Sequence, residues 1–227
     1  MRPYVFVNVA MSADGKISTK ERRQVKISGK NDFLRVDRIK AESDAVMVGI
    51  GTVLADNPSL TVKSQQLRDE RKREGKDEDP VRVVIDSHAR TPPDADILRK
   101  GTGTRIIAVS AAAPQERVEH LKKVANVVVA GSESVDLPEV LAILYQHGVR
   151  RLMVEGGGTL IWSLISQGLV DAMYTYIGSM VIGGRDAPTP ADGEGFLHES
   201  DFIRLQLSEA EPMDDGLLVR WDVRIIR

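Results

Sequence analysis

The amino-acid sequence predicts an α/β fold with a mostly parallel central sheet. Short apolar runs alternate with amphipathic helical segments from residue 4 to residue 169. Continuous apolar strands separated by helices are typical of parallel sheets that are covered on both faces. After residue 169 the pattern changes, and two strands follow one another without a helix, which indicates antiparallel pairing. We therefore predict a single domain over residues 1–227, with helices flanking the sheet and antiparallel C-terminal strands.

The predicted strands share an apolar, β-branched character and end at turn residues. They cover residues 4–10, 44–49, 81–86, 105–109, 127–129, 151–155, 172–182, 202–207 and 217–226. Asn8 is a polar exception within the first of them. Its side chain must either find partners in the core or face a ligand.

The predicted helices share apolar residues at three- and four-residue spacing. They cover residues 33–41, 114–124, 136–147 and 160–169, with a short helical piece after Gly49. Ser28 or Asn31 is the expected N-cap of the first, and Asp136 with Pro138 begins the third in the favoured way. The charged run 65–79 is predicted to be a solvated helix or a flexible insertion, with weak internal ion pairs.

Composition excludes several function classes. The chain has 227 residues, a net charge of -2 and 42% hydrophobic residues, so neither nucleic acid nor a membrane is an expected partner. There is no cysteine, which excludes disulfides, thiolate zinc sites and cysteine nucleophiles. The four histidines are scattered, and no metal site is expected. With no signal peptide or membrane-spanning segment in the sequence, we expect a cytoplasmic protein.

A glycine-rich turn is the most informative stretch. Gly156, Gly157 and Gly158 lie between a predicted strand ending at Glu155 and a helix whose first residues include Thr159 and Leu160. Glycine permits positive φ and the close approach of a ligand. The N-terminus of the following helix is a favourable seat for a phosphate. The alternative is that the glycines only allow a tight strand-to-helix connection.

A second glycine turn, Gly49–Asn57, also follows a predicted strand. Thr52 and Asp56 lie four residues apart and would share one face of a helical turn. Two such turns at the carboxyl ends of parallel strands suggest a ligand of dinucleotide size. Neither turn has the nucleotide-triphosphate motif, and no nucleophile elbow is present. Hydride transfer with a nicotinamide cofactor is the chemistry that remains.

Several motifs in this order resemble the pyrimidine reductases of riboflavin biosynthesis. The resemblance runs from about residue 4 to the C-terminus and is carried by Asn8–Ile17, Ser43–Val46, Gly49–Pro58, Arg82–Ser87 and Glu155–Thr159. The loop Pro188–Phe196 is similar to that of the stand-alone archaeal branch. That branch, with its fungal counterpart, reduces 2,5-diamino-6-ribosylamino-4(3H)-pyrimidinone 5′-phosphate.

The resemblance implies a dihydrofolate-reductase-like fold, NADPH as hydride donor (with NADH possible) and a homodimer acting on a small-molecule substrate. Bacterial members are fused to a zinc deaminase with a cysteine-containing signature. This chain has no cysteine and no room for that domain, so we expect a reductase only.

The resemblance also assigns residues. Those that match cofactor contacts are Thr52, Asp56, Ser87, Gly156, Gly157, Gly158, Thr159 and Leu160. Those expected at the substrate are Asn8, Lys40, Leu60 and Glu155. Lys40 stands where bacterial members have an arginine, which would weaken a bidentate phosphate grip. Arg90 and Lys63 are candidates for holding a 2′-phosphate.

The implied reaction opens the ribosylamino group to an imine, and hydride then reaches C1′ of the sugar. The imine nitrogen needs a proton or a hydrogen bond as charge develops. Glu155 is the first candidate for this role, and Lys16 or Asp14 the second; pocket geometry with solvent as the proton source could also suffice. A dihydrofolate reductase and a non-catalytic nucleotide-sensing module are the alternative functions.

Overall fold

The computed structural model describes residues 1–23 and 25–224. Its elements divide into two compact units that each combine distant segments of the chain. Unit 1 contains Met1–Tyr4 and Asp37–Met153, and unit 2 contains Val5–Val36 and the chain from Val154 onward. Three elements run through the boundaries between these segments, namely β1 (Tyr4–Ser12), α1 (Lys30–Ala41) and β6 (Arg151–Gly156).

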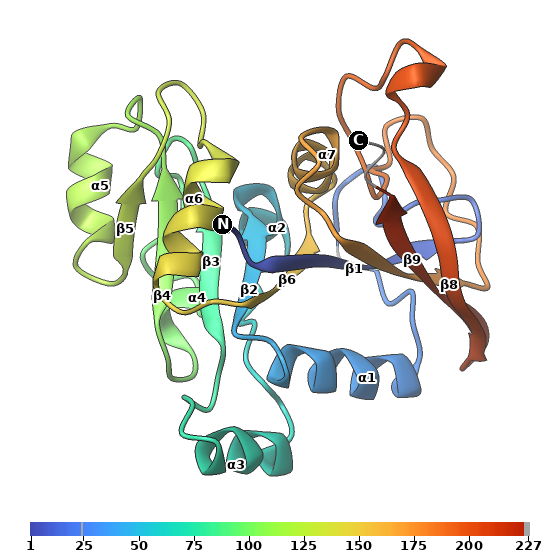
Figure 1. The fold of residues 1–227 in the computed structure, drawn as a ribbon, viewed down its shortest axis with the longest axis horizontal. Coiled ribbons are helices and arrows are strands. Elements are labelled where there is room, and N and C mark those ends of the chain that lie inside the picture. The colour runs from blue at the N-terminus through green and yellow to red at the C-terminus, as the bar shows by residue number, and fades with distance from the viewer. Residues whose placement is uncertain (24, 225–227) are drawn as a thin grey trace. The chain divides into compact units, whose positions relative to one another are not determined.

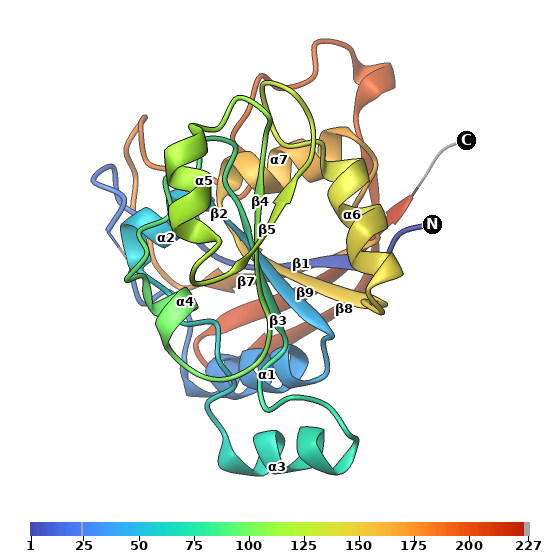
Figure 2. The same cartoon turned by 90° about the vertical axis from the view of Figure 1, so that its left-hand side faces the viewer.

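Unit 1 contains a parallel sheet in the order β5-β4-β3-β2. Its strands are β2 (Ala45–Gly49), β3 (Val81–Ile85), β4 (Arg105–Val109) and β5 (Asn126–Val129). The helices of this unit are α2 (Ile50–Asp56), α3 (Gln65–Arg73), α4 (Asp96–Arg99), α5 (Gln115–Leu121) and α6 (Leu137–Gln146). Figure 2 shows α5 and α6 on opposite faces of these strands. Burial on both faces explains the mainly apolar sequences of β2, β3 and β4, whereas the edge strand β5 is exposed or half-exposed along its length.

Unit 2 contains mixed strands in the order β1-β7-β9-β8. β1 (Tyr4–Ser12) pairs with β7 (Ala172–Gly178) in parallel. β9 (Gly216–Arg224) is antiparallel to β7 and also to β8 (Arg204–Met213). Helix α7 (Gly158–Ser166) and the 3₁₀ turn η1 (Glu199–Asp201) belong to this unit. In Figure 1 the β8–β9 hairpin is drawn in orange-red to dark red, with β8 at the outer edge.

The predicted fold class is confirmed, because the strands are mostly parallel, helices flank them and the C-terminal strands are antiparallel. Predicted and observed elements agree closely in unit 1. β7 is shorter than predicted and ends at Gly178, and the last two residues of the predicted 217–226 strand lie outside the described residues. A single domain over residues 1–227 stays a prediction.

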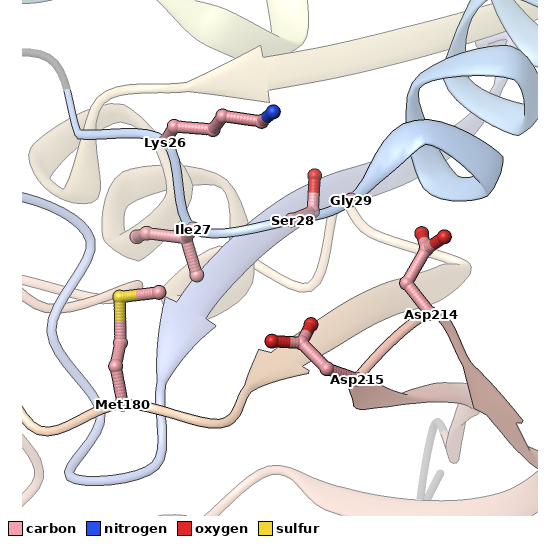
Figure 3. Close-up of a pocket in the computed structure, with 7 residues that line it drawn as sticks. All are labelled: Lys26, Ile27, Ser28, Gly29, Met180, Asp214 and Asp215. Atoms are coloured by element: carbon pink, nitrogen blue, oxygen red, sulfur yellow. The ribbon is translucent and has the colours of Figure 1, made fainter.

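The N-cap of α1 differs from the prediction. Neither Ser28 nor Asn31 caps this helix with its own side chain. The carboxylate of Asp214, on the β8–β9 turn, instead accepts hydrogen bonds from the backbone N–H groups of Asn31 (3.1 Å) and Asp32 (3.0 Å). Gly29 is required beside it, because a Cβ there would lie 2.4 Å from the carboxyl carbon of Asp214. Figure 3 shows Asp214 beside Gly29 at the start of the helix.

The charged segment 65–79 is only partly solvated, which corrects the prediction for it. Arg71 of α3 is 5% exposed. Its guanidinium donates hydrogen bonds to the carbonyl oxygens of Ala41, Ser43 and Asp77, and these bonds fix α3 to the end of α1. A charge run does not reveal which of its members will be buried, because only tertiary contacts distinguish them. Among the described residues, no helix is long and apolar enough to span a membrane.

Candidate active site

The glycine-rich turn connects β6 to α7 in unit 2. Gly156 and Gly157 have φ values of 146° and 94°, a region that side-chain-bearing residues rarely adopt. Gly157 is the N-cap of α7 and offers no side-chain hydrogen bond to it. Glu155 is half-buried and is the last residue but one of β6; its place at the rim of a site stays a prediction. The helix N-terminus that follows favours a negatively charged group.

Glycine is needed at the third position of this turn, Gly158, for a different reason. A Cβ on Gly158 would lie 2.4 Å from the carbonyl oxygen of Thr189 and 2.9 Å from a carboxylate oxygen of Asp192. The backbone N–H of Asp192 also donates to the carbonyl oxygen of Gly158 at 3.1 Å. The loop around residues 188–192 therefore packs directly on the start of α7, and glycine is needed there for packing. Thr159 is exposed and Leu160 is buried within the same first helical turn.

Asp14 and Lys16 belong to the turn that follows β1. The Asp14 carboxylate accepts hydrogen bonds from the Ser12 hydroxyl (2.6 Å) and from the backbone N–H groups of Ile182 (3.0 Å) and Gly183 (2.7 Å). These bonds, with that of Ser12 foremost, lower the pKa of Asp14 to about 2. Asp14 therefore keeps its charge at neutral pH and fixes the chain after β7. The Lys16 Nζ atom donates to the carbonyl oxygen of Ala187 at 3.2 Å.

Asn8 has a protein partner. Its side-chain oxygen accepts a 2.7 Å hydrogen bond from the Arg35 guanidinium of α1, which also forms an ion pair with Asp32 at 2.7 Å. Asn8 is 9% exposed and Asp32 is 2% exposed, so this polar network is buried between β1 and α1. The hydrogen bond from Arg35 therefore satisfies the side-chain oxygen of the buried Asn8. Arg35 was not identified from the sequence, where it looks like any helix-surface arginine.

The second glycine turn lies at the carboxyl end of β2 in unit 1. Thr52 and Asp56 share one face of α2, as their four-residue spacing predicts. A Cβ on Gly51 would meet no atom within 4 Å, so neither packing nor a positive φ requires glycine there. Burial raises the pKa of Asp56, and among the described residues no side-chain or backbone group donates a hydrogen bond to its carboxylate. An open glycine beside a half-buried carboxylate fits a ligand that donates hydrogen bonds.

Ser87 follows β3 at the same edge of the unit 1 sheet. Its hydroxyl accepts a hydrogen bond from the backbone N–H of Val135 at 3.1 Å. Its carbonyl oxygen accepts from the hydroxyl of Ser110, which follows β4, at 2.8 Å. Ser87 is half-buried, so the residue helps to shape the carboxyl ends of β3 and β4 while remaining partly accessible.

The loop between α2 and α3 carries Leu60 in an unusual conformation. Leu60 is 4% exposed and has a φ of 52°, in the left-handed region. A non-glycine residue there is disfavoured by about 1–2 kcal/mol. Such residues gather at functional sites, where the surrounding structure holds them. The left-handed conformation is compatible with a binding role for Leu60, which stays a prediction. No sequence pattern predicts this conformation.

Lys63, in the same loop, is exposed. Its pKa is lowered, first by partial desolvation and next by the positive charge of Lys40. The Lys63 Nζ atom donates hydrogen bonds to the hydroxyls of Ser59 and Thr61, each at 2.8 Å. Lys40 is 8% exposed. The negative charges of Asp37 and Asp79 act in the opposite direction and raise the pKa of Lys63. Lys63 and the predicted substrate residue Lys40 thus influence one another electrostatically within unit 1.

A pocket of about 350 Å³ lies in unit 2 beside the N-terminus of α1 (Figure 3). It is lined by Lys26, Ile27, Ser28, Gly29, Met180, Asp214 and Asp215. Asp215 is engaged on both oxygens, by Tyr176 at 3.2 Å and Ser179 at 2.7 Å. Within the described part of the chain, no group of three or more histidine, aspartate or glutamate side chains could hold a metal ion.

The predicted residues thus fall into two groups. Unit 1 contains Lys40, Thr52, Asp56, Leu60 and Ser87, and unit 2 contains Asn8, Asp14, Lys16, Glu155, Gly156, Gly157, Gly158, Thr159 and Leu160. Within unit 1, Leu60 and Lys63 share one short loop, and the backbone N–H of Lys63 donates a hydrogen bond to Asp37, one helical turn before Lys40 on α1. Within unit 2 it places Asp14 and Lys16 in one turn and pairs Asn8 with Arg35.

Comparison with known proteins gives consistent matches. The family model of the RibD C-terminal domain matches residues 3–219. A protein from Archaeoglobus fulgidus is 57% identical over 206 residues, covering 91% of this chain and 94% of that relative. One from Methanothermobacter thermautotrophicus is 47% identical over 224 residues, covering 99% and 100%. Both are named 2,5-diamino-6-ribosylamino-4(3H)-pyrimidinone 5′-phosphate reductase.

Solved structures give the same fold. Acinetobacter baumannii RibD superposes with a TM-score of 0.80 at 26% identity, covering 98% of this chain and 58% of that one. The riboflavin biosynthesis reductase of Saccharomyces cerevisiae superposes with a TM-score of 0.72 at 20% identity, covering 98% and 90%. At that identity the second likeness supports the fold alone.

Proposed function

The chain belongs to the RibD C-terminal domain family, and we propose that it reduces 2,5-diamino-6-ribosylamino-4(3H)-pyrimidinone 5′-phosphate to the ribitylamino product in riboflavin biosynthesis. The observation that carries this proposal is 57% identity, over 91% of the chain, to an archaeal reductase of that name. A reductase of this kind uses a nicotinamide cofactor, and within the proposal the donor is NADPH, with NADH as the alternative.

The proposed cofactor contacts fit the local chemistry of each unit. In unit 1, the unpaired Asp56 carboxylate accepts hydrogen bonds from the cofactor, with Thr52 on the same face of α2 and Ser87 at the end of β3. In unit 2, the turn Gly156–Gly158 and the first turn of α7, with Thr159 and Leu160, hold phosphate. When bound, the reduced nicotinamide supplies the hydride.

The proposed substrate contacts begin with the lysines. Lys40 and Lys63 hold the 5′-phosphate, because two adjacent ammonium groups are matched by a doubly charged anion. If Lys63 binds the substrate phosphate, it is no longer a candidate for the 2′-phosphate of NADPH. Arg90, whose Nε atom lies 3.7 Å from a carboxylate oxygen of Asp86, is then the remaining candidate for that group. Leu60 packs against the substrate from the same loop, and Asn8 contributes through its bond to Arg35.

The proposed reaction adds hydride to C1′ of the ring-opened imine. Glu155, half-buried at the end of β6, orients or polarises the imine nitrogen as its charge changes. Lys16 is the second candidate, and its ammonium group is held by the carbonyl oxygen of Ala187, on the loop whose Thr189 and Asp192 lie against Gly158. Asp14 acts by positioning the chain around residues 182–183 rather than by giving up a proton, since its pKa is about 2.

We further propose that the enzyme is a cytoplasmic homodimer. The basis for the dimer is the β8–β9 hairpin, where Leu205 and Leu207 are 41% and 54% exposed. Both face the same way as their cross-strand partners Val223 and Trp221. An apolar sheet face of this kind is typical of an interface, and a second copy of the chain covers it in a symmetric dimer.

The deciding experiment follows the absorbance of NADPH at 340 nm, a property of the reduced nicotinamide. Purified protein is mixed with NADPH and the diamino-ribosylamino-pyrimidinone phosphate, and parallel reactions contain the deaminated pyrimidine or dihydrofolate. We expect turnover with the first substrate alone. Turnover with dihydrofolate would contradict the proposal and indicate a dihydrofolate reductase. NADPH binding without turnover of any substrate would indicate a nucleotide-sensing module.

A further inference from the structure

One face of α1 connects the two lysines of the proposed phosphate site. Asp37 and Lys40 are three residues apart and therefore project from the same side of the helix. They are 9% and 8% exposed. The Asp37 carboxylate accepts hydrogen bonds from two successive backbone N–H groups, those of Lys63 (2.7 Å) and Ser64 (2.8 Å). The same helical turn therefore carries Lys40 and, through Asp37, binds the backbone N–H of Lys63.

The remainder of this loop is held by a second buried carboxylate. Asp79, 2% exposed, accepts hydrogen bonds from the backbone N–H groups of Val62 (2.8 Å) and Thr102 (2.9 Å). Two carboxylates therefore fix three successive residues, 62–64, just after Leu60 in its left-handed conformation. Because the backbone of residues 62–64 is held in place, the Lys63 side chain loses less conformational entropy when it binds an anion.

We propose that Asp37 is a positioning residue, which fixes the Lys63 ammonium beside Lys40 and so shapes the seat of the substrate phosphate. The inference rests on the proposed function. Asp37 itself carries a negative charge, which raises the pKa of Lys63 against the opposing effects of burial and Lys40. By charge alone, Asp37 disfavours a phosphate in this place. If Asp37 acts by positioning Lys63, removal of its carboxylate should weaken phosphate binding. If it acts only through its negative charge, removal should strengthen phosphate binding.

The test is Asp37→Asn in the full chain. The asparagine amide retains one acceptor oxygen, so one of the two backbone N–H groups loses its partner. We expect the KM for the phosphorylated substrate and the inhibition constant of inorganic phosphate each to rise roughly tenfold. The kcat should stay within about threefold, and the KM for NADPH should not change, since ground-state binding alone is affected. An unchanged or lower KM and inhibition constant would overturn the proposal.

Two further variants separate charge from geometry. Asp37→Glu keeps the charge but moves both oxygens by one methylene, and we expect weaker phosphate binding again. Asp69→Asn removes a similar charge from the exposed side of α3, where Asp69 accepts a hydrogen bond from Gln65, and should leave phosphate binding unchanged. If Asp37→Asn fails to fold, judged by circular dichroism, the glutamate variant decides the question.

A binding measurement without turnover completes the design. Inorganic phosphate should raise the melting temperature of the wild type more than that of Asp37→Asn or Asp37→Glu, because a ligand stabilises the state that binds it. Equal shifts in all three proteins would overturn the positioning role. If the wild type shows no reductase activity, the proposed function fails instead, and the two failures are distinguishable.

Discussion

At the scale of single residues, the two carboxyl groups Glu155 and Asp14 are expected to behave differently. Glu155→Gln should lower kcat roughly a hundredfold, as is typical when a group that assists proton transfer is removed. Asp14→Asn should leave kcat within about threefold, because Asp14 holds the backbone N–H groups of Ile182 and Gly183 and keeps its charge. Steady-state kinetics at saturating substrate measure both values. A large loss of kcat in Asp14→Asn alone would reverse this assignment.

The pH dependence of stability gives an independent measure of Asp14. Its pKa is lowered in the folded protein, from 3.8 to about 2. A carboxyl group of this kind stabilises the fold above its unfolded pKa, and the effect is lost as the pH falls toward the folded value. The difference in urea midpoint between wild type and Asp14→Asn should therefore be full at pH 5 to 7 and shrink below about pH 4. A difference that is constant down to pH 2.5 would contradict this.

The predicted residues differ in how far the sequence could define them. Asn8 and Glu155 stand out in the sequence because one interrupts and the other ends an apolar strand, and strand ends are where parallel sheets bind ligands. Asp14 is a candidate only through the family resemblance. The hydrogen-bond partners of Asn8 and Asp14 could not be predicted from the sequence. Arg35 lies 27 residues from Asn8, and Ile182 lies 168 residues from Asp14. The left-handed φ of Leu60 leaves no trace in the sequence either, because leucine is not selected for that conformation.

At the scale of elements, the start of α1 depends on the β8–β9 turn. Asp214→Ala removes the carboxylate that caps Asn31 and Asp32, and loss of an N-cap typically lowers the free energy of unfolding by about 1 kcal/mol. Asp214→Asn keeps an acceptor and tolerates the φ of 52° at this position, so its effect should be smaller. Urea unfolding at pH 7 measures both variants.

The control for the cap is Glu194→Ala, which removes a similar charge from an exposed loop. It should leave the unfolding free energy within about 0.5 kcal/mol of wild type. Equal stability of Asp214→Ala and Glu194→Ala would show that the turn does not cap the helix. The sequence placed α1 correctly from its apolar spacing, but it suggested local caps because Ser28 and Asn31 are the nearest suitable residues. A cap 183 residues away in sequence depends on tertiary structure.

At the scale of the whole molecule, the proposed dimer depends on the β8–β9 hairpin. Strict alternation along β8 would place Glu209 on the same face as Leu205 and Leu207. A bulge between Leu207 and Glu209 shifts the register, so Ala210 opposes Val219 and the apolar face continues. Glu209 turns to the other face, where it pairs with Arg220 at 3.0 Å. The bulge thus separates a charged face from an apolar face that remains exposed on β8.

The dimer proposed for this face should dissociate when a charge is placed in it. Leu207 is 54% exposed, so a glutamate at this position reaches water in a single chain, and Leu207→Glu should fold but become monomeric. Light scattering coupled to size-exclusion chromatography measures the mass. Gln206→Glu introduces the same charge on the opposite face and should leave the dimer intact. A wild type that is monomeric at micromolar concentration, or a Leu207→Glu variant of unchanged mass, would exclude the hairpin as the dimer interface.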